Sequence, residues 1–455
     1  MPGARRGGAA RDAGLLTVPR DVLGTAFHTA FRSAFHTAFR SAFRSLSVRN
    51  FRLFAAGQVL SVSGTWMMVV GQDWLVLTLT DSPGTALAAV TAAQFTPMLL
   101  LTLYGGRLAD RHAKRPLLAW CNAASGAGAL GLGVLVALDA ARLWHLLLFG
   151  CWLGTVNAVE VPTRMAFVGE LVGPELLPNA SALSAAYFNV ARVVGPAAAG
   201  LLIAVAGVGP LMLLNAVSHV AVVVALRRMD PAALRPVAPG APGRIADGLR
   251  YVRGRPDLVV TLTLVAFVAL FGMNFPLTLP LLAKTVFHAS AGTFGLLTTA
   301  FALGSLAGAL ATTARRTRPS ARLVAGAAVV FGVLEAASGR APGYGSAAVL
   351  LAATGCAAIV FSQAANHRVQ LGSDPRYRGR VLALYTLILQ GSTPVGAALV
   401  GWLTTRFDAR AGLYAGGLLS LVSVLAVVLA DRLRRRRRTA RTERERARQA
   451  APDLR

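Results

Sequence analysis

The chain is poor in acidic residues and in cysteine. Only 19 of its 455 residues are Asp or Glu, against 46 Lys or Arg, and these four types together make up 14% of the chain. Because soluble domains carry about 25% charged residues, this composition excludes an ordinary soluble fold. The three cysteines, Cys121, Cys151 and Cys356, fall in apolar runs and lack metal-ligand spacing, so neither disulfides nor a metal site are expected.

Several signatures of catalysis are also missing from the sequence. It contains no phosphate-binding P-loop, no His cluster at metal spacing, no pair of catalytic carboxylates and no Ser/His arrangement at a shared depth. Residues 1–50 lack an apolar core long enough for a cleavable signal peptide. An enzyme, a nucleotide-driven pump and a bound cofactor are therefore not expected.

Apolar runs dominate the rest of the chain. Hydrophobic residues make up 55% of it, and its mean hydropathy is +0.57. A helix needs roughly 20 predominantly apolar residues to cross a bilayer. The sequence therefore predicts an all-α integral membrane protein with twelve transmembrane helices. These runs lie near residues 53–79, 85–107, 116–138, 143–166, 181–206, 209–228, 258–283, 292–314, 321–338, 344–368, 380–405 and 412–431.

Polar segments divide the runs into two groups of six. Gly84-Thr85 at the start of the second run recurs as Gly292-Thr293 at the start of the eighth, as expected for two pseudo-symmetric six-helix bundles. Five prolines lie between residues 231 and 256 in the connection between the groups. The expected parts are a cytoplasmic segment at 1–50, a bundle at 51–228, a cytoplasmic loop at 229–257, a second bundle at 258–432 and a basic cytoplasmic tail at 433–455.

A low-complexity repeat of Ala-Phe-His/Arg-Ser/Thr occupies residues 26–45. A period of four nearly matches the helical turn, so the phenylalanines would form one stripe of an amphipathic helix on the inner leaflet. The alternative, which we favour, is a repeat expansion or a start codon placed too far upstream.

The net charge of +27 is typical of a nucleic-acid partner, but its distribution favours a membrane instead. Basic residues cluster in alternate loops, as the positive-inside rule expects. We therefore expect no nucleic-acid partner, and a multi-pass protein of the cell membrane with both termini cytoplasmic. The expected outer loops hold only five basic residues, namely Arg142, Lys284, Arg340, Arg406 and Arg410.

A charged stretch, Gly105–Arg115, separates the second and third runs. It matches the pattern Gly-x-Leu-Ala-Asp-Arg-x-Gly-Arg-Arg, with the basic Lys114 in place of the first closing arginine, except at Ala113, where a second glycine is usual. This stretch resembles the signature of the major facilitator superfamily of secondary transporters. The resemblance covers roughly residues 46–432 of the chain. The residues that fit are Gly106, Leu108, Ala109, Asp110, Arg111, Lys114 and Arg115.

Three further stretches, Gln72–Leu77, Asn157–Arg164 and Arg378–Val381, are similar to the enterobactin-exporter-like drug:proton antiporters. In the fifth run, Gly195 and Pro196 resemble the Gly-Pro motif of antiporters, and Gly200 is the next glycine. The paired glycine that usually follows the proline is missing.

The resemblance implies a gate at the Gly105–Arg115 loop. Gly106 would allow a close helix approach, and Asp110 would bind the inner amino end of span eleven, near Arg380, as a latch. Arg111, Lys114 and Arg115 belong to the gate or serve topology alone. Glu160 and Arg164, spaced i,i+4, are expected to pair and relay charge to this loop.

Ionisable residues inside the spans are costly and usually face a cavity or a partner. We predict that Asp73 is the proton-titrating site and that Arg192 tunes it or contacts substrate. The alternatives are a hydrogen-bond acceptor at the outer gate for Asp73 and a purely structural pair for Arg192. Arg192 corresponds to Gln390 in the second half, so both are expected near the midplane. Other candidate cavity residues are Asn274, Gln363 and Asn366, while Glu335 is expected to snorkel at an outer helix end.

These features predict a monomeric, proton-coupled exporter of a small, partly apolar molecule such as a drug, a siderophore or a secondary metabolite. Export would proceed by alternating access, with the two halves rocking about a midplane site. The alternatives are an importer of a small metabolite and a membrane sensor that no longer transports. Few polar residues in the spans argue against a sugar as cargo.

Overall fold

The computed structural model describes residues 43–81, 83–235, 245–313 and 317–449. Within these residues, twelve helical segments are long and apolar enough to cross a membrane, which confirms the predicted number. The first six are α2 (Arg49–Leu79), α3 (Pro83–Arg111), α4 (Lys114–Ala137), α5 (Leu143–Val172), α6 (Leu177–Ala206) and α7 (Val208–Arg227). The others are α9 (Pro256–Phe271) with α10 (Phe275–Leu281) and η3 (Leu282–Val286), then α11 (Ala291–Thr313), α12 (Ala321–Gly339), α13 (Tyr344–Gly372), α14 (Arg378–Arg406) and α15 (Ala409–Gln449).

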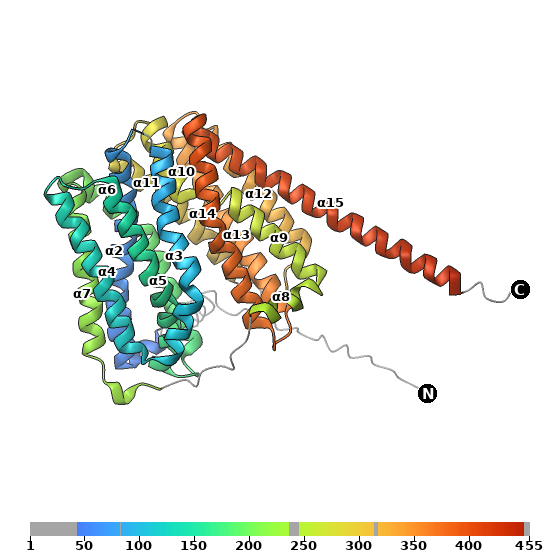
Figure 1. Ribbon diagram of the computed structural model, residues 1–455, viewed down its shortest axis with the longest axis horizontal. Helices are drawn as coiled ribbons and strands as arrows, with labels where there is room; N and C mark the ends of the chain where they lie inside the picture. Colours follow the sequence, from blue (N-terminus) through green and yellow to red (C-terminus); the bar gives the residue numbers. More distant parts are fainter. Residues whose placement is uncertain (1–42, 82, 236–244, 314–316, 450–455) are drawn as a thin grey trace, which may run out of the picture.

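The helices form two bundles that lie side by side in Figure 1. In the first bundle α3 packs on α5, and α7 packs on both α2 and α4. In the second, α11 packs on α13, and α12 packs on α15. The bundles meet mainly through α3 against α14 and α6 against α11. This is the arrangement of two six-helix bundles that the sequence predicts.

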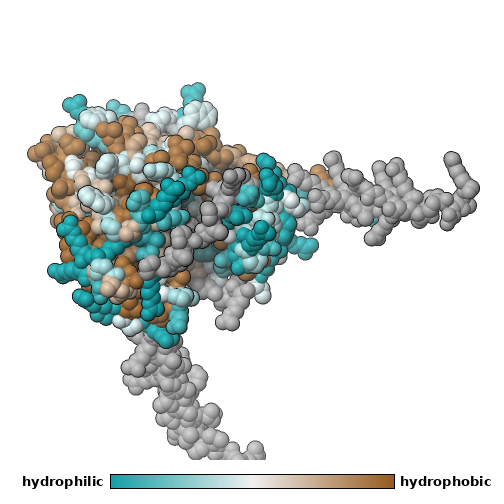
Figure 2. Space-filling view, turned by 60° about the horizontal axis from the view of Figure 1, so that its bottom comes forward, coloured by the Kyte–Doolittle hydropathy of each residue, from teal (hydrophilic) through white to brown (hydrophobic). Residues whose placement is uncertain are grey.

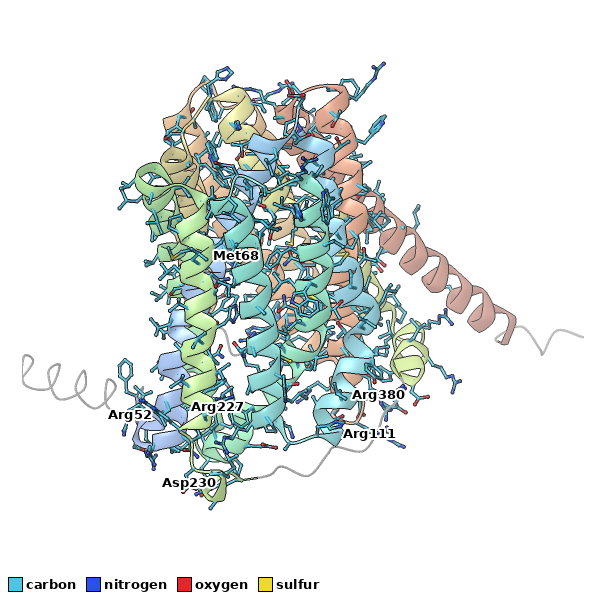
Figure 3. All side chains as sticks on the ribbon, turned by 60° about the vertical axis from the view of Figure 1, so that its left-hand side comes forward. Arg52, Met68, Arg111, Arg227, Asp230 and Arg380 are labelled. Atoms are coloured by element: carbon cyan, nitrogen blue, oxygen red, sulfur yellow. The ribbon has the colours of Figure 1, made fainter. Side chains whose placement is uncertain are left out.

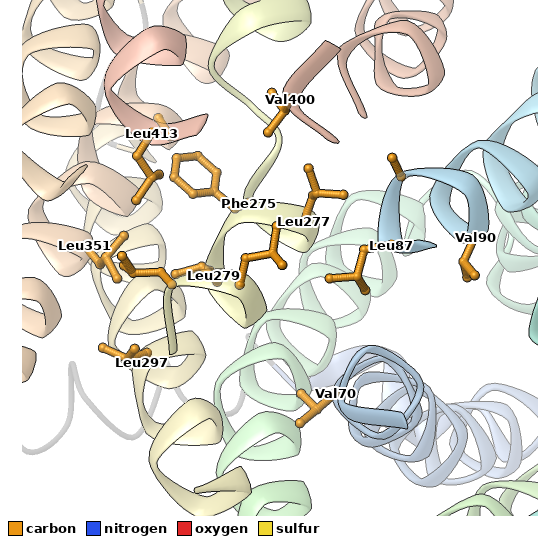
Figure 4. Close-up of a cluster of buried hydrophobic side chains, with 14 of the residues drawn as sticks. Val70, Leu87, Val90, Phe275, Leu277, Leu279, Leu297, Leu351, Val400 and Leu413 are labelled. Carbon is orange, nitrogen blue, oxygen red and sulfur yellow. The ribbon is translucent and has the colours of Figure 1, made fainter. Parts of the chain in front are cut away.

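Helix α10 supplies a large part of the apolar core between the bundles. Phe275, Leu277 and Leu279 are all at least 94% buried, and Figure 4 shows them among side chains from both halves. Val70 and Leu87 belong to the same cluster of buried residues, from α2 and α3. The halves are thus joined by apolar packing as well as by the chain.

The seventh span is broken rather than continuous, contrary to the uninterrupted run expected at 258–283. Helix α9 ends at Phe271 and α10 begins at Phe275. Proline lacks an N–H group and fits the first turn of a helix, which is where Pro276 lies. Asn274, expected in a cavity, is instead buried and donates its side-chain amide to the carbonyls of Leu270 and Phe271, at 2.9 and 3.3 Å. It therefore satisfies carbonyls that the break sets free.

The surface has the distribution of a membrane protein. Figure 2 shows apolar side chains over the flanks and hydrophilic ones gathered at the end of the molecule that comes forward. At that end α8 (Ile245–Arg253), within the central connection, packs on the start of α14, where Tyr251 stacks on Tyr377 with ring centroids 4.6 Å apart. Of the expected repeat at residues 26–45, only the last three residues fall within the described part of the chain.

Glu335 does not snorkel, contrary to expectation. Its side chain on α12 lies inside the second bundle, where the residue is 2% exposed. One carboxylate oxygen, Oε2, has no hydrogen-bond partner among the described residues, and the same holds for the buried hydroxyl of Ser420 on α15. The prediction failed because helix periodicity does not reveal which face of α12 meets α9 and α15.

Candidate substrate cavity and gates

A cavity of about 310 Å³ lies within the first bundle and faces the second. All six helices α2–α7 contribute to its wall, and Gln390 of α14 is the lining residue from the second bundle within the described part of the chain. Gln390 was one of the residues predicted to line a substrate cavity, and it lies on the wall of this one. The wall combines apolar and polar side chains. Its aromatic members are Trp66, Phe95, Phe149 and Phe188, and its polar members include Gln58, Gln72, Gln94, Asn157 and Asn215.

Glu160 and Arg164 form the predicted ion pair, and both line this cavity. Arg164 Nε lies 3.0 Å from Glu160 Oε1, and the two side chains are 23% and 15% exposed. Helix α5 continues to Val172, so the pair lies within the span and not at its inner end as expected. The acid that contacts the 105–115 segment is Glu170, whose Oε1 lies 2.7 Å from Lys114 Nζ.

A polar network around His219 was missed at the sequence level. His219 Nδ1 lies 3.1 Å from Asn122 Oδ1 and 3.5 Å from Ser61 Oγ. Since Asn122 uses its amide nitrogen to bond the Leu118 carbonyl, its oxygen accepts and His219 Nδ1 donates. The network lines the cavity, so the scarcity of polar residues assumed above does not hold for this wall.

The sequence did contain a signal for this wall. In α2, Gln58, Ser61, Thr65, Met68 and Gln72 follow one another at steps of three and four residues, and all five line the cavity. Such steps place side chains on one face of a helix. A polar face on an otherwise apolar span indicates a water-filled or ligand-filled side.

A second cavity, of about 120 Å³, contains both Asp73 and Arg192. Its walls come from α2, α6, α10 and α11, and it shares Trp66 and Val69 with the larger cavity. No described residue forms a hydrogen bond or ion pair with the Asp73 carboxylate. Arg192 and Gln390, expected at equivalent positions, therefore face different cavities. Asp73 and Arg192 line the same cavity, and no hydrogen bond or ion pair joins their side chains.

The bundles are closed against each other at the end where α2 finishes. Lys284 of η3 donates to the carbonyl of Leu77, with a distance of 2.9 Å, and its Nζ lies 5.3 Å from the ring centroid of Trp74. Trp74 in turn stacks on Phe294 of α11, at 6.2 Å. A cation at the carboxy end of a helix is stabilised by free carbonyls and by the helix dipole. Because the sequence predicts that this end faces outward, we call the group formed by Lys284, Leu77, Trp74 and Phe294 the outer clamp.

The span-five motif packs the bundles at the same end. A Cβ on Gly195 would lie 2.7 Å from Trp66 Cβ, and a Cβ on Gly200 would lie 2.9 Å from the Ala291 carbonyl. The carbonyl of Pro196 occupies the place that a Cβ on Gly295 of α11 would need. The motif thus permits close contact of α6 with α2 and α11.

The opposite end of the bundle interface is open. Residues 100–104 of α3 are all exposed. Because successive residues of a helix are rotated by about 100°, these five lie on all sides of α3, so no neighbouring helix in the described part of the chain covers it there. A Cβ on Gly106 or on Gly379 of α14 would meet nothing within 4 Å. Asp110 is exposed and forms no ion pair or hydrogen bond with the described residues, so the expected contact with the start of α14 is not made in this conformation.

The Gly105–Arg115 segment is mostly helical, not a turn. Helix α3 runs through Arg111 and α4 begins at Lys114. The close approach expected at Gly106 occurs at Gly105, where a Cβ would overlap the Ala158 carbonyl of α5. Arg115 donates to the carbonyls of Leu226 and Arg227, at 2.6 and 2.9 Å.

Lys114 and Arg115 therefore fasten the segment to its own bundle, to α5 and α7 respectively, instead of reaching across to the second bundle. Arg111 is exposed and has no such contact among the described residues. Figure 3 shows Arg111 at the same end of the molecule as Arg227 and Arg380. Gln363 and Asn366 of α13 are half-buried and line neither of the two cavities.

Two helical bundles with a cavity that is closed at one end and open at the other have the layout of a membrane transporter. Residues 40–453 match the transmembrane secretion effector family. The chain belongs to this family of the major facilitator superfamily, which makes it a multi-pass membrane transporter of small molecules.

The relatives include an enterobactin exporter and a staphyloferrin A transporter. The chain is 25% identical over 400 residues to the enterobactin exporter EntS of Citrobacter koseri, covering 85% of this chain and 92% of that one. It is 26% identical over 266 residues to the staphyloferrin A transporter of Staphylococcus aureus, covering 56% and 64%. Among solved structures, a bacterial homologue of the iron transporter ferroportin in its inward-facing state superposes with a TM-score of 0.65 at 17% identity, covering 84% and 98%.

Proposed function

We propose that this protein is a monomeric, proton-coupled exporter of a small, partly apolar molecule with several polar groups, of the siderophore type. Both termini would be cytoplasmic, and the cavity would open alternately to the two sides of the membrane. The exporters among the relatives support the direction, and the mixed aromatic and polar wall supports the cargo. An ion pair at the wall can bind carboxylate, hydroxyl or catecholate groups by charge-assisted hydrogen bonds.

The observation that carries proton coupling is the position of Asp73. Its carboxylate has no partner among the described residues, and it lies in the small cavity beside the substrate cavity. Trp66 and Val69 border both cavities, so cargo in the larger one would press on the wall of the smaller one. Occupation by cargo and protonation of Asp73 would then influence each other through α2.

Asp73→Asn should abolish proton-driven transport while leaving cargo binding within about threefold. The measurement uses everted membrane vesicles with enterobactin and staphyloferrin A as probes, and follows cargo uptake and cargo-dependent proton release. The expected loss is at least tenfold in rate, because a group that cannot titrate cannot carry the proton.

Asp81→Asn is the matched control, since Asp81 is an exposed acid just beyond the same helix. Full proton-driven transport by Asp73→Asn would contradict the coupling proposal. Saturable binding without flux in the unaltered protein would favour a sensor, and proton-driven movement in the opposite direction would favour an importer.

Two gates would alternate in this cycle. The outer clamp is formed in the present conformation, whereas Asp110 would engage the start of α14 only when the inner end closes. There, Arg380 lies 4.0 Å from Asp247 of α8, so the region already attracts an acid. Free N–H groups at the helix start would add to this attraction.

Lys284→Gln and Asp110→Asn should shift the conformational equilibrium in opposite directions, each by roughly tenfold, because each removes one charge-assisted contact. Gly379→Cys, in a background without Cys121, Cys151 and Cys356, reports closure of the inner end by its rate of maleimide labelling. Labelling should slow in Lys284→Gln and quicken in Asp110→Asn.

Arg406→Gln is the control, because Arg406 is an exposed cation outside the outer clamp. Shifts of the same sign in the Lys284 and Asp110 variants would eliminate the two-gate scheme.

A further inference from the structure

A groove of about 400 Å³ lies on the first bundle between α4 and α7, away from the substrate cavity. The two share no lining residue. Figure 1 places α4 and α7 on the side of the molecule remote from the second bundle, and Figure 3 places Arg227 at its hydrophilic end. The groove therefore opens toward lipid and not toward the transport path.

One end of the groove is cationic. It is formed by Arg115 and Arg227, of which Arg227 is exposed. Two hydrogen bonds to the end of α7 hold the Arg115 guanidinium in place, and they use two of its five N–H donors. None of the groove residues is acidic. The nearby acid Glu170 is already paired with Lys114.

The rest of the groove is apolar. One side of the groove is a face of α4 that follows Arg115 in the helix, formed by Pro116, Ala119, Trp120 and Ala123. Val223 of α7 lines the opposite side. Trp120 is 76% exposed. It lies five residues from Arg115, about 8 Å along the helix axis, which is the depth at which tryptophan meets the headgroup region.

We propose that this groove is a binding site for an anionic phospholipid, with its phosphate at Arg115 and Arg227 and an acyl chain along Ala119, Trp120 and Ala123. A guanidinium held in place can donate two parallel hydrogen bonds to a phosphate. The small residues beside the tryptophan leave room for an acyl chain. Cationic pockets between spans at the inner surface attract anionic headgroups. The proposal does not depend on the direction or coupling of transport.

The test measures lipid retention by the full-length protein in native mass spectrometry. The protein is extracted into detergent with equimolar phosphatidylglycerol and phosphatidylcholine, and the bound lipids are counted. The unaltered protein should retain phosphatidylglycerol in preference to phosphatidylcholine. Arg227→Gln should lower that preference by roughly fivefold, because one basic contact is lost.

Arg228→Gln is the matched control, since Arg228 is the neighbouring exposed arginine and does not line the groove. Its lipid preference should remain that of the unaltered protein. Ala123→Phe should lower retention although no charge is changed, because the side chain fills the groove. Arg227→Gln and Ala123→Phe test the groove without changing Arg115, because loss of Arg115 would also release the end of α7.

Equal losses in Arg227→Gln and Arg228→Gln would overturn the proposal, because they would indicate general attraction of the surface for anions. Equal retention of the two lipids by the unaltered protein would overturn it as well. Unchanged retention in Ala123→Phe would exclude a chain within the groove.

Discussion

Gly105→Ala should prevent α3 from packing on α5, whereas Gly106→Ala should be tolerated. A Cβ on Gly105 overlaps the Ala158 carbonyl, and backbone atoms cannot move aside as a flexible side chain can. Overpacking of a core typically costs about 1–3 kcal/mol, and a forced separation of two helices lies at the upper end of that range. At Gly106 the same methyl group enters open space and helix propensity improves by about 1 kcal/mol.

Fluorescence-detected size-exclusion chromatography and thermal unfolding of both variants give the measurement. The Gly105 variant should show a large loss of monodisperse protein, and the Gly106 variant an unchanged or slightly higher melting temperature. The two positions are adjacent, so each serves as the control for the other. The same melting temperature in both variants would mean that the α3–α5 contact is not as close as described.

Arg164→Gln should destabilise the protein and abolish cargo binding, and Glu160→Gln on the same background should restore much of the stability. Removing one partner leaves a charge in a partly enclosed cavity, which costs more than removing both. Since the side chains are 23% and 15% exposed, we expect about 1–3 kcal/mol for the single change. Binding should stay low in the double variant, because neither charge remains to hold a polar cargo group.

A double-mutant cycle on the melting temperature and on enterobactin binding provides the measurement. Additive effects of Glu160→Gln and Arg164→Gln on stability would contradict the ion pair. Asn157→Ala, one turn away on the cavity wall, controls for general damage to α5. It should weaken binding without changing the stability by more than about 0.5 kcal/mol.

Relations along one helix could be predicted from the sequence. Glu160 and Arg164 pair because a spacing of four residues brings side chains together whatever surrounds the helix. The twelve spans follow from run lengths alone. The polar face of α2 could have been found by the same argument, since its steps of three and four residues are visible in the sequence.

Relations between helices could not be predicted in this way. Gly106 fits the family signature, yet Gly105 is the residue that α5 approaches, and only the rotation of α3 distinguishes them. Lys284 was one of five basic residues in expected outer loops, and its contact with Leu77 joins residues 207 positions apart. The polar side chain of Asn274 bonds a backbone carbonyl at the break in the seventh helix, and it does not line the substrate cavity.

The sequence by itself determined the membrane class, the number of spans and the Glu160–Arg164 pair, because composition, run length and helical period are local properties. Its short motifs carried the resemblance to the family. Only the tertiary structure showed which residues line the cavity, which residues form the outer clamp, and that Asp110 makes no contact across the bundle interface. It also showed that residues of the Gly105–Arg115 stretch differ in their contacts. Lys114 and Arg115 bind helices of the first bundle, while Asp110 remains exposed. The physical reason is that a side chain's partner is set by the rotation and depth of each helix against its neighbours. Those are fixed by packing across the whole bundle.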